Sequence, residues 1–347
     1  MFGGAFRVAR SKVPTALQPE TVWQVYRLQY AILLAIVGSY VVGTQAFGNT
    51  VDWSVYTRYY NVYLFGGREY YQLDPAFRLL FSIFAFFRLH LQYVLSILVF
   101  VSLLIKLLVL TSLSRSSLPA TFYLFALFGL HEYTQVRVAF ALSFIYLFVW
   151  LMERGHRVRI LWVIAPFFHM STLVFAAVVV MCRPFREKSF WFKVGVCTGF
   201  IVALAGSLHL VSAVFSSSNL VNYLNGYDSG RVPKVFSITN MIFATYSVLL
   251  IRIGVHRWSK ASELIVLATI LAIPAIFAFY SEPVLSDRFK EFFFAFSPIS
   301  FALALRRFRR TPAMILLVVS FVLFSLSSTV VYINNGIYPS LKPYALR

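Results

Sequence analysis

Apolar runs of about 20 residues recur along the chain and are separated by short basic clusters. Runs of this length suit helices that cross a bilayer, whereas strands of a membrane β-barrel alternate over about ten residues. The pattern predicts an all-α, polytopic helical bundle of about ten membrane segments, forming a single transmembrane domain over residues 1–347. The expected spans lie at about 28–47, 91–110, 121–130, 138–152, 194–215, 236–251, 264–280, 292–305 and 314–332, with a further apolar run at 160–181.

The composition excludes an ordinary water-soluble domain, because 60% of the residues are hydrophobic and only 12% are charged. A net charge of +19 would suggest a nucleic-acid partner in a soluble protein, but here Lys and Arg lie in short loops between apolar runs. We therefore expect a lipid bilayer as the surroundings and no nucleic acid. Cys182 and Cys197 lie at or inside apolar runs without metal-ligand spacing, which predicts packing residues.

The basic residues also predict the orientation of the chain. Arg10, Lys12 and Arg27 precede the first apolar run, which lacks a cleavage site. We expect this run to be a retained span that follows a cytoplasmic N-terminus. The span at about 91–110 should return the chain to a cytoplasmic turn that contains Lys106 and Arg115.

The run at 160–181 has two alternative paths, which the charges of the later loops distinguish. A single crossing would place the clusters 183–193, 252–260 and 306–310, with eleven Lys and Arg together, on the outer side. A re-entrant pair of half-helices turning at His169 would keep all three clusters in the cytoplasm. Such a turn is tolerated where it is buried in protein or lines a wet cavity, so this path also predicts a cavity around His169.

With the re-entrant path, the candidate chemistry falls in external segments at about 48–90, 131–137, 216–235 and 281–291. The first of these places Asp52, Glu69 and Asp74 among aromatic residues that include Tyr59 and Tyr60. Aromatic faces cover the apolar side of a sugar ring, and carboxylates accept hydrogen bonds from its hydroxyl groups. This composition suits carbohydrate, although it also suits an interfacial aromatic belt with solvated acids.

Arg137 and His169 are the residues whose placement in apolar sequence most needs an explanation. An arginine at the centre of a membrane helix costs about 2.5–3.5 kcal/mol, so it normally faces a cavity or a partner. Arg137 begins a span, where it either snorkels to the interface or binds an anion. His169 follows Pro166, and it is either a packing residue or, in a turn open to water, a phosphate ligand or a base.

The later external segments add further polar residues. Tyr227 and Arg231 lie in a turn-rich stretch that suits either gating or direct ligation. Arg288 lies at the predicted start of a helix, where the helix dipole and the guanidinium both favour an anion.

Motifs for several enzyme classes are missing from the sequence. It contains no G-x-x-x-x-G-K-[ST], H-E-x-x-H, G-x-S-x-G or C-x-x-C pattern. Their absence argues against an ATPase, a zinc protease, a serine hydrolase and thiol chemistry, and we expect neither a metal nor a cofactor. Acidic residues are few and none is expected in the middle of a span, which weakens an ion-coupled transporter.

Several runs, taken in order, resemble a known family. VRVAFALSFIYLF at 136–148, a basic turn, and VIAPFFHMSTLVF at 163–175 resemble the EpsG-like branch of the Wzy-type bacterial polysaccharide polymerases. VDWSVYTRYYN, DPAFRLLFSIF and SDRFKEFFF are similar to that family's first loop, to a helix start and to a late helix led by arginine. Two positions differ: Val138 stands where the family usually has glutamine, and Asp74-Pro75-Ala76 replaces an acidic-Pro-Gly segment.

The resemblance implies a glycosyltransferase of the bacterial inner membrane with an active site facing the periplasm. It would act on an undecaprenyl-diphosphate-linked oligosaccharide, passing the growing chain to a sugar hydroxyl of the next lipid-linked repeat unit. The product would be an O-antigen, capsule or exopolysaccharide, and a chain-length regulator protein is a further expected partner. The base would be His169, Asp52 or Asp74, and the expected substrate contacts are Arg137, Arg288, Tyr59, Tyr60, Tyr227 and Arg231.

Three other activities fit the same residues. A ligase would transfer the finished polymer onto another lipid or a protein. A flippase would move the lipid-linked oligosaccharide without making a bond. A membrane acyltransferase would use His169 as its base.

Overall fold

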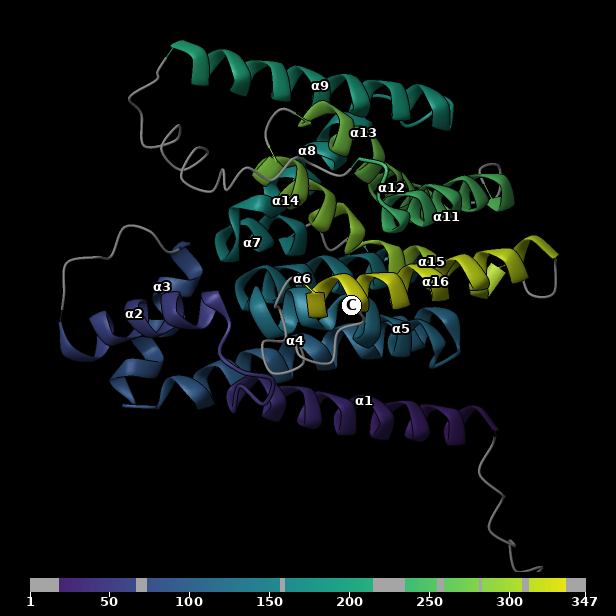
Figure 1. The fold of residues 1–347 in the computed structure, drawn as a ribbon. Coiled ribbons are helices and arrows are strands. Elements are labelled where there is room, and N and C mark those ends of the chain that lie inside the picture. The colour runs from purple at the N-terminus through teal and green to yellow at the C-terminus, as the bar shows by residue number, and fades with distance from the viewer. Residues whose placement is uncertain are drawn as a thin grey trace, which may run out of the picture.

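The computed structural model describes residues 19–66, 74–156, 160–214, 235–254, 259–280, 283–307 and 312–334. Every regular element in these ranges is a helix, which confirms the predicted all-α fold (Figure 1). The elements are α1 Pro19–Gly43, α2 Val51–Phe65, α3 Pro75–Phe86, α4 Leu91–Ser114, α5 Leu118–Ala126, the π-helix η2 Phe128–Thr134, α6 Val136–Glu153, α7 Ile160–Phe168, the 3₁₀ turn η3 Met170–Thr172, α8 Leu173–Cys182, α9 Phe190–Val214, α11 Ile238–Gly254, α12 Lys260–Ile270, α13 Ala272–Ala278, α14 Pro283–Phe294, α15 Ser297–Arg307 and α16 Pro312–Asn334.

Among the described residues, six helical stretches are long and apolar enough to cross a membrane, so the chain is a multi-pass membrane protein. They are Val22–Gly43, Leu91–Ser114, Val136–Glu153, Phe190–Ser207, Lys260–Ala278 and Pro312–Val331. The other expected crossings fall on shorter helices. The span expected at 292–305 is divided, because α14 ends at Phe294 and α15 begins at Ser297. Pro298 lies in the first turn of α15, a position that suits a residue without a backbone N–H.

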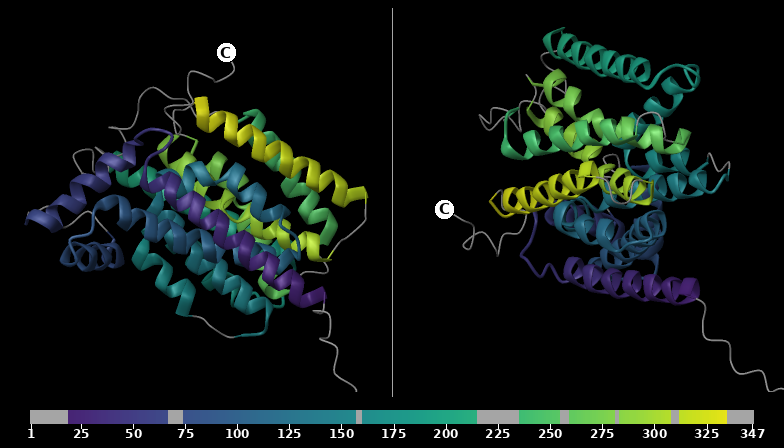
Figure 2. Two further views of the ribbon diagram at one scale, coloured as in Figure 1. Left: turned by 90° about the horizontal axis from the view of Figure 1, so that it is seen from below. Right: turned by 90° about the vertical axis from the view of Figure 1, so that its right-hand side faces the viewer.

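The helices are stacked in layers from α1 at one edge to α9 at the other (Figure 2). The α4 and α6 helices lie between these edges and carry much of the buried core, including Leu103, Leu107 and Ile145. Helix α1 packs along α4 through small residues, because a side chain at Gly43 would meet Ser96 and the backbone of Gln92. Small residues of this kind let two membrane helices approach closely.

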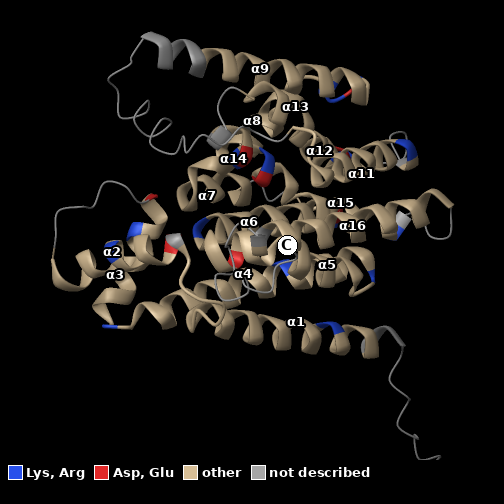
Figure 3. Cartoon of the chain, in the orientation of Figure 1, with Lys and Arg blue, Asp and Glu red and all other residues tan. Residues whose placement is uncertain are grey.

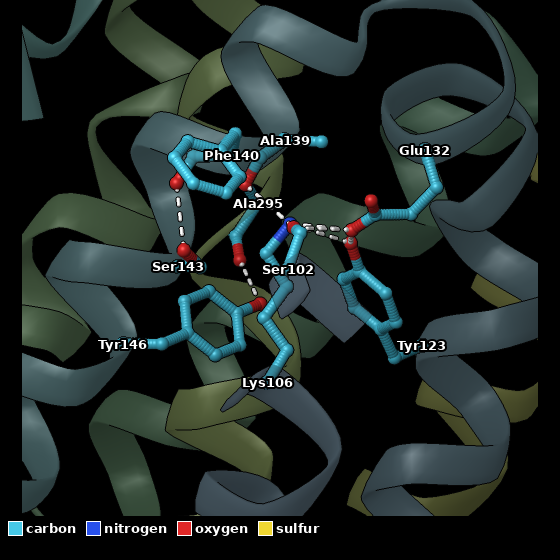
Figure 4. Close-up of polar contacts among 9 residues, drawn as sticks. All are labelled: Ser102, Lys106, Tyr123, Glu132, Ala139, Phe140, Ser143, Tyr146 and Ala295. Carbon is cyan, nitrogen blue, oxygen red and sulfur yellow. Dashed lines mark hydrogen bonds and ion pairs between the residues drawn. The ribbon is translucent and has the colours of Figure 1, made fainter. Parts of the chain in front are cut away.

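Lys106 does not lie in a cytoplasmic turn, so that prediction is wrong. Helix α4 continues to Ser114, and Lys106 is fully buried within it, where its Nζ lies 2.6 Å from Glu132 Oε1 (Figure 4). The Tyr123 hydroxyl donates to the same Glu132 oxygen at 2.7 Å, and Ser102 Oγ lies 3.2 Å from it. Pairing of the two charges removes the need for either side chain to reach water.

Glu132 belongs to the π-helix η2, within the segment expected to form an external turn. His131 and Glu132 are both fully buried, and no ring nitrogen of His131 has a hydrogen-bond partner among the described residues. Glu132 lies outside the six candidate spans, so it is not an acid in the middle of a span, although it is fully buried. π-Helical turns are rare and occur frequently at functional sites.

Basic side chains from distant helices gather at one end of the bundle, which we call the basic end (Figure 3). It contains Arg27, Arg115, Arg154, Arg186, Lys193, Lys260 and Arg306. Ion pairs join several of the helix ends there, including Lys193–Glu263 at 2.8 Å and Lys260–Glu187 at 2.9 Å. Cys182 and Cys197, predicted to be packing residues, are free thiols whose sulfur atoms lie 3.7 Å apart.

Candidate active site

Asp74 brings together the two residues that the sequence analysis found most in need of an explanation. Its Oδ2 lies 3.1 Å from Arg137 Nη1 and 3.3 Å from His169 Nδ1. The backbone N–H of Met170 donates to Asp74 Oδ1 at 3.2 Å. Three segments that are far apart in the chain therefore meet at one carboxylate. Arg137 begins α6, whose other end lies at the basic end, so this site lies at the opposite end of the bundle.

Asp74 immediately precedes α3, but its side chain does not cap that helix. It occupies the N-cap position, yet its side chain makes no capping hydrogen bond, and Pro75 supplies a first residue that needs no N–H partner. Both carboxylate oxygens are thus directed to other segments. Helix α7 packs against both α3 and α6, which brings parts of the three helices together near Asp74 (Figure 1).

His169 lies at a break between two short helices. Pro166 stands inside α7, where it removes a backbone donor, and His169 itself is extended at φ −160° and ψ 121°. The His169 carbonyl accepts hydrogen bonds from the N–H of Thr172 at 3.1 Å and from its hydroxyl at 2.8 Å. These bonds hold the turn that points the imidazole toward Asp74.

The contact with Asp74 determines the tautomer of a neutral His169. A carboxylate only accepts hydrogen bonds, so Nδ1 carries the hydrogen and Nε2 is the acceptor. Nε2 forms no hydrogen bond with another described residue. The His169 side chain is 24% exposed, whereas that of Asp74 is only 8% exposed. The buried carboxylate therefore orients an imidazole whose other nitrogen is free to take a proton.

Asp74 is held as a carboxylate. Burial raises the pKa of Asp74, but the hydrogen bond and charge of His169, the charge of Arg137 and the Met170 N–H together bring that pKa below its ordinary value. The Arg137 side chain is 23% exposed. Its Cζ atom lies 6.0 Å from the centre of the Tyr56 ring. Burial raises the pKa of the Tyr56 hydroxyl to about 12, so this residue stays neutral.

Asp52 lies one turn before Tyr56 on α2 and faces the same charges. Burial raises the pKa of Asp52, while the charges of Arg288, Arg137 and His169 oppose that rise. Asp52 forms no ion pair with another described residue. It is therefore near the site but does not contact Asp74 or His169 directly.

Arg288 is exposed and forms no ion pair with another described residue. The segment that contains Arg288 was predicted to start a helix, and α14 does begin there, at Pro283, so that Arg288 lies in its second turn. Its charge reaches Asp52 and Glu291, so the guanidinium is still part of the same electrostatic environment. The dipole of the helix start does not add to it there.

Gln135 and Glu291 were not predicted as site residues. Gln135 Nε2 donates to Glu291 Oε2 at 3.4 Å, which links the start of α6 to α14. Burial raises the pKa of Glu291, against the charges of Arg288 and Lys290. The spacing of Arg288 and Glu291, three residues apart on one helix, was the signal that they share a face.

The remaining predicted contacts fall into two groups. The Tyr60 hydroxyl donates to the Leu89 carbonyl at 2.7 Å, and its ring packs edge-on against Phe81, so Tyr60 is a packing residue. Tyr59 is half-buried on α2. Tyr227 and Arg231 lie outside the described residues. Within the described ranges, no three His, Cys, Asp or Glu side chains form a group that could hold a metal ion.

The two carboxyl groups with opposite pKa shifts should respond oppositely to pH. The lowered pKa of Asp74 means that its contribution to stability is present above about pH 4 and is lost as pH falls through its folded-state value. The raised pKa of Glu291 means that its contribution is present at low pH and is lost as pH rises through its folded-state value. Thermal unfolding from pH 3 to pH 8 checks both. The Tm of wild type should exceed that of Asp74→Asn by a margin that becomes smaller only in acid. The Tm of Glu291→Gln should rise relative to that of wild type as pH rises. If Tm changed with pH in the same way in Asp74→Asn and Glu291→Gln, the two opposite pKa shifts would be contradicted.

The apolar helices and the buried, paired charges define the class as a multi-pass α-helical membrane protein. A family model described as the EpsG family matches residues 30–346, which is most of the chain. The chain therefore belongs to the EpsG family, which is associated with exopolysaccharide biosynthesis. No curated protein and no solved structure shows significant similarity to it. The family part of the resemblance is confirmed, and the polymerase activity stays a prediction.

Proposed function

We propose that this chain is a polysaccharide polymerase of the bacterial inner membrane. It transfers a glycan chain from undecaprenyl diphosphate onto a sugar hydroxyl of the next lipid-linked repeat unit, at the periplasmic face. The observation that carries the proposal is the contact of His169 and Arg137 with one buried carboxylate, Asp74. Membership of the EpsG family supports the same class of substrate.

The geometry supports the following roles. His169 Nε2 accepts the proton of the acceptor hydroxyl, as its oxygen bonds to the anomeric carbon of the donor sugar. The bond from that carbon to the diphosphate oxygen breaks, and the lipid diphosphate leaves with the electron pair. Asp74 stabilises the imidazolium that forms, as the acid of a catalytic triad does. Arg137 and Arg288 stabilise the charge that develops on the diphosphate.

The same proposal includes a re-entrant α7–α8 pair. At 1.5 Å per residue the two helices are about 14 and 15 Å long, so neither reaches across a hydrocarbon core of about 30 Å. Trp162 near the start of α7 and Cys182 at the end of α8 line the same cavity at the basic end. His169, between them, contacts Asp74 at the opposite end. A chain that enters the membrane through α7, turns at His169 and returns through α8 accounts for the position of Trp162 and Cys182 at one end and of His169 at the other. The positive-inside rule then puts the basic end in the cytoplasm.

This orientation predicts which positions an impermeant thiol reagent can label. In a Cys182→Ser/Cys197→Ser background, Ser189→Cys at the basic end should stay unlabelled in intact cells and become labelled after permeabilisation. Ser54→Cys, which is exposed on α2 beside the site, is the matched position and should be labelled in intact cells. The reverse pattern, or labelling of both, would overturn the orientation.

The activity is tested with the purified full-length chain and an undecaprenyl-diphosphate-linked repeat unit. A polymerase converts this substrate into a ladder of longer lipid-linked products without any other enzyme. In cells that lack the protein, single repeats should still reach the surface lipid, because export does not depend on a polymerase. Loss of all surface repeats would favour a flippase instead. Formation of single-repeat products on a second lipid without any ladder would favour a ligase.

A further inference from the structure

A cavity of about 500 Å³ opens at the basic end between α6, α7, α8 and α12. It lies at the far end of α6 from Arg137 and is separate from the site around Asp74. Its volume falls within the range of sites that bind small molecules. The proposed glycosyl transfer gives it no role.

The polar side of this cavity is strongly basic. His156, Arg183, Arg186, Lys193 and Lys260 line it, together with one acid, Glu263. Glu263 is already paired with Lys193 at 2.8 Å, and Lys260 is paired with Glu187 at 2.9 Å. Neither guanidinium of the two arginines forms an ion pair with another described residue. Two free arginines three residues apart therefore remain at the mouth of the cavity.

The rest of the cavity lining is largely apolar and reaches the surface of the bundle. Phe148, Leu264 and Leu267 form its inner wall, and Leu267 is buried. Val180 also lines it but is 56% exposed, so the cavity continues onto the outer face of the helices. In a membrane, that outer face is covered by lipid chains.

We propose that this cavity binds an acidic phospholipid. The phosphate lies between Arg183 and Arg186, and an acyl chain follows the apolar wall past Trp162 and Val180. Arginine is the side chain best suited to bind phosphate through paired N–H groups. A small soluble anion would match the arginines but would leave the apolar wall unused, whereas a lipid matches both. Basic pockets between helices on the cytoplasmic side are a recognised type of lipid site. The proposal does not depend on the glycosyl-transfer activity.

The test follows the thermal stability of the full-length chain in a neutral detergent. Phosphatidylglycerol should raise the Tm in a saturable way, because a ligand that binds only the folded state stabilises it. Phosphatidylcholine with the same acyl chains, and inorganic phosphate at the same concentration, are the comparison arms. Arg183→Gln/Arg186→Gln should raise the phosphatidylglycerol concentration needed for half the shift by about tenfold or more, because the charged hydrogen bonds of both guanidinium groups to the phosphate are lost.

Lys188→Gln/Arg252→Gln is the matched control, because it removes two exposed charges from the same end without changing the cavity. It should respond to phosphatidylglycerol as wild type does. A second readout is quenching of Trp162 by phosphatidylglycerol with brominated acyl chains, identified by its loss in Trp162→Phe. Equal responses to the two lipids would overturn the proposal, and so would equal responses of the two double variants. A full shift with phosphate alone would show a site for a free anion and would also overturn it.

Discussion

His169→Ala is expected to lower the rate of polymer formation by about 10²- to 10⁴-fold, the usual contribution of a general base. Asp74→Asn should have an effect of about 10²-fold or more, because an amide cannot stabilise the imidazolium and can impose the wrong tautomer. Asn has nearly the same side-chain volume as Asp, and Ala has a smaller one than His, so neither variant introduces a steric clash. The measurement is the initial rate of ladder formation by purified protein at saturating substrate.

The control for these two variants is Glu187→Gln, which removes an exposed carboxylate at the basic end. It should polymerise at the wild-type rate. Arg137→Lys separates charge from geometry, since lysine keeps the charge and loses the planar fork that binds a diphosphate. Its defect should appear in kcat as well as in kcat/KM, because the lost contacts stabilise charge that develops in the transition state. Wild-type rates for His169→Ala and Asp74→Asn at equal protein levels would disprove the proposed base.

Lys106→Met and Glu132→Leu should each destabilise the protein by about 3–5 kcal/mol. Each single change leaves a buried charge without its partner, in a position where neither side chain is exposed at all. Removal of Glu132 also takes away the acceptor of the Tyr123 hydroxyl. The double variant Lys106→Met/Glu132→Leu should recover most of the loss, because a buried ion pair replaced by apolar residues is often neutral.

Unfolding by heat or denaturant in detergent measures the change in the free energy of unfolding. Wild type, the two single variants and the double variant form a double-mutant cycle. Lys260→Met is the matched control, because it breaks an exposed ion pair that should contribute about 0–1 kcal/mol. Single variants as stable as wild type would show that the Lys106–Glu132 pair does not contribute to the stability of the fold. A double variant as unstable as the sum of the singles would contradict the compensation.

The helical class and two residues of the site, Arg137 and His169, follow from the sequence for the same reason. Membrane helices need long apolar runs, and polar residues that interrupt such runs are costly enough to stand out. Arg137 and His169 were selected on that ground, and Asp74 as an acid among aromatic residues. Their mutual contact was not predicted, because residues separated by 63 and 95 positions are brought together only by tertiary packing.

The errors have a common physical cause. Lys106 was taken as the mark of a loop because a single lysine is usually at the membrane surface, but its partner Glu132 removes that requirement. Glu132 lies 26 residues further along the chain, so no local pattern shows the pair. The helix that begins near Arg288 was predicted, but its first residue, Pro283, was not, so the sequence did not show that Arg288 lies in the second turn. Helix boundaries are the least certain feature of any sequence pattern.

The short stretch from η2 to α6 links the buried ion pair to the site. Glu132 lies inside η2 and Arg137 follows it by five residues, in the first turn of α6. The two segments do not form one continuous helix, because Gln135 between them has the non-helical angles φ −100° and ψ 58°. The number of residues in this connection therefore fixes the position of Arg137 relative to Glu132. Loss of one residue would separate Arg137 from Asp74 or Glu132 from Lys106, so the core and the site depend on the same few residues.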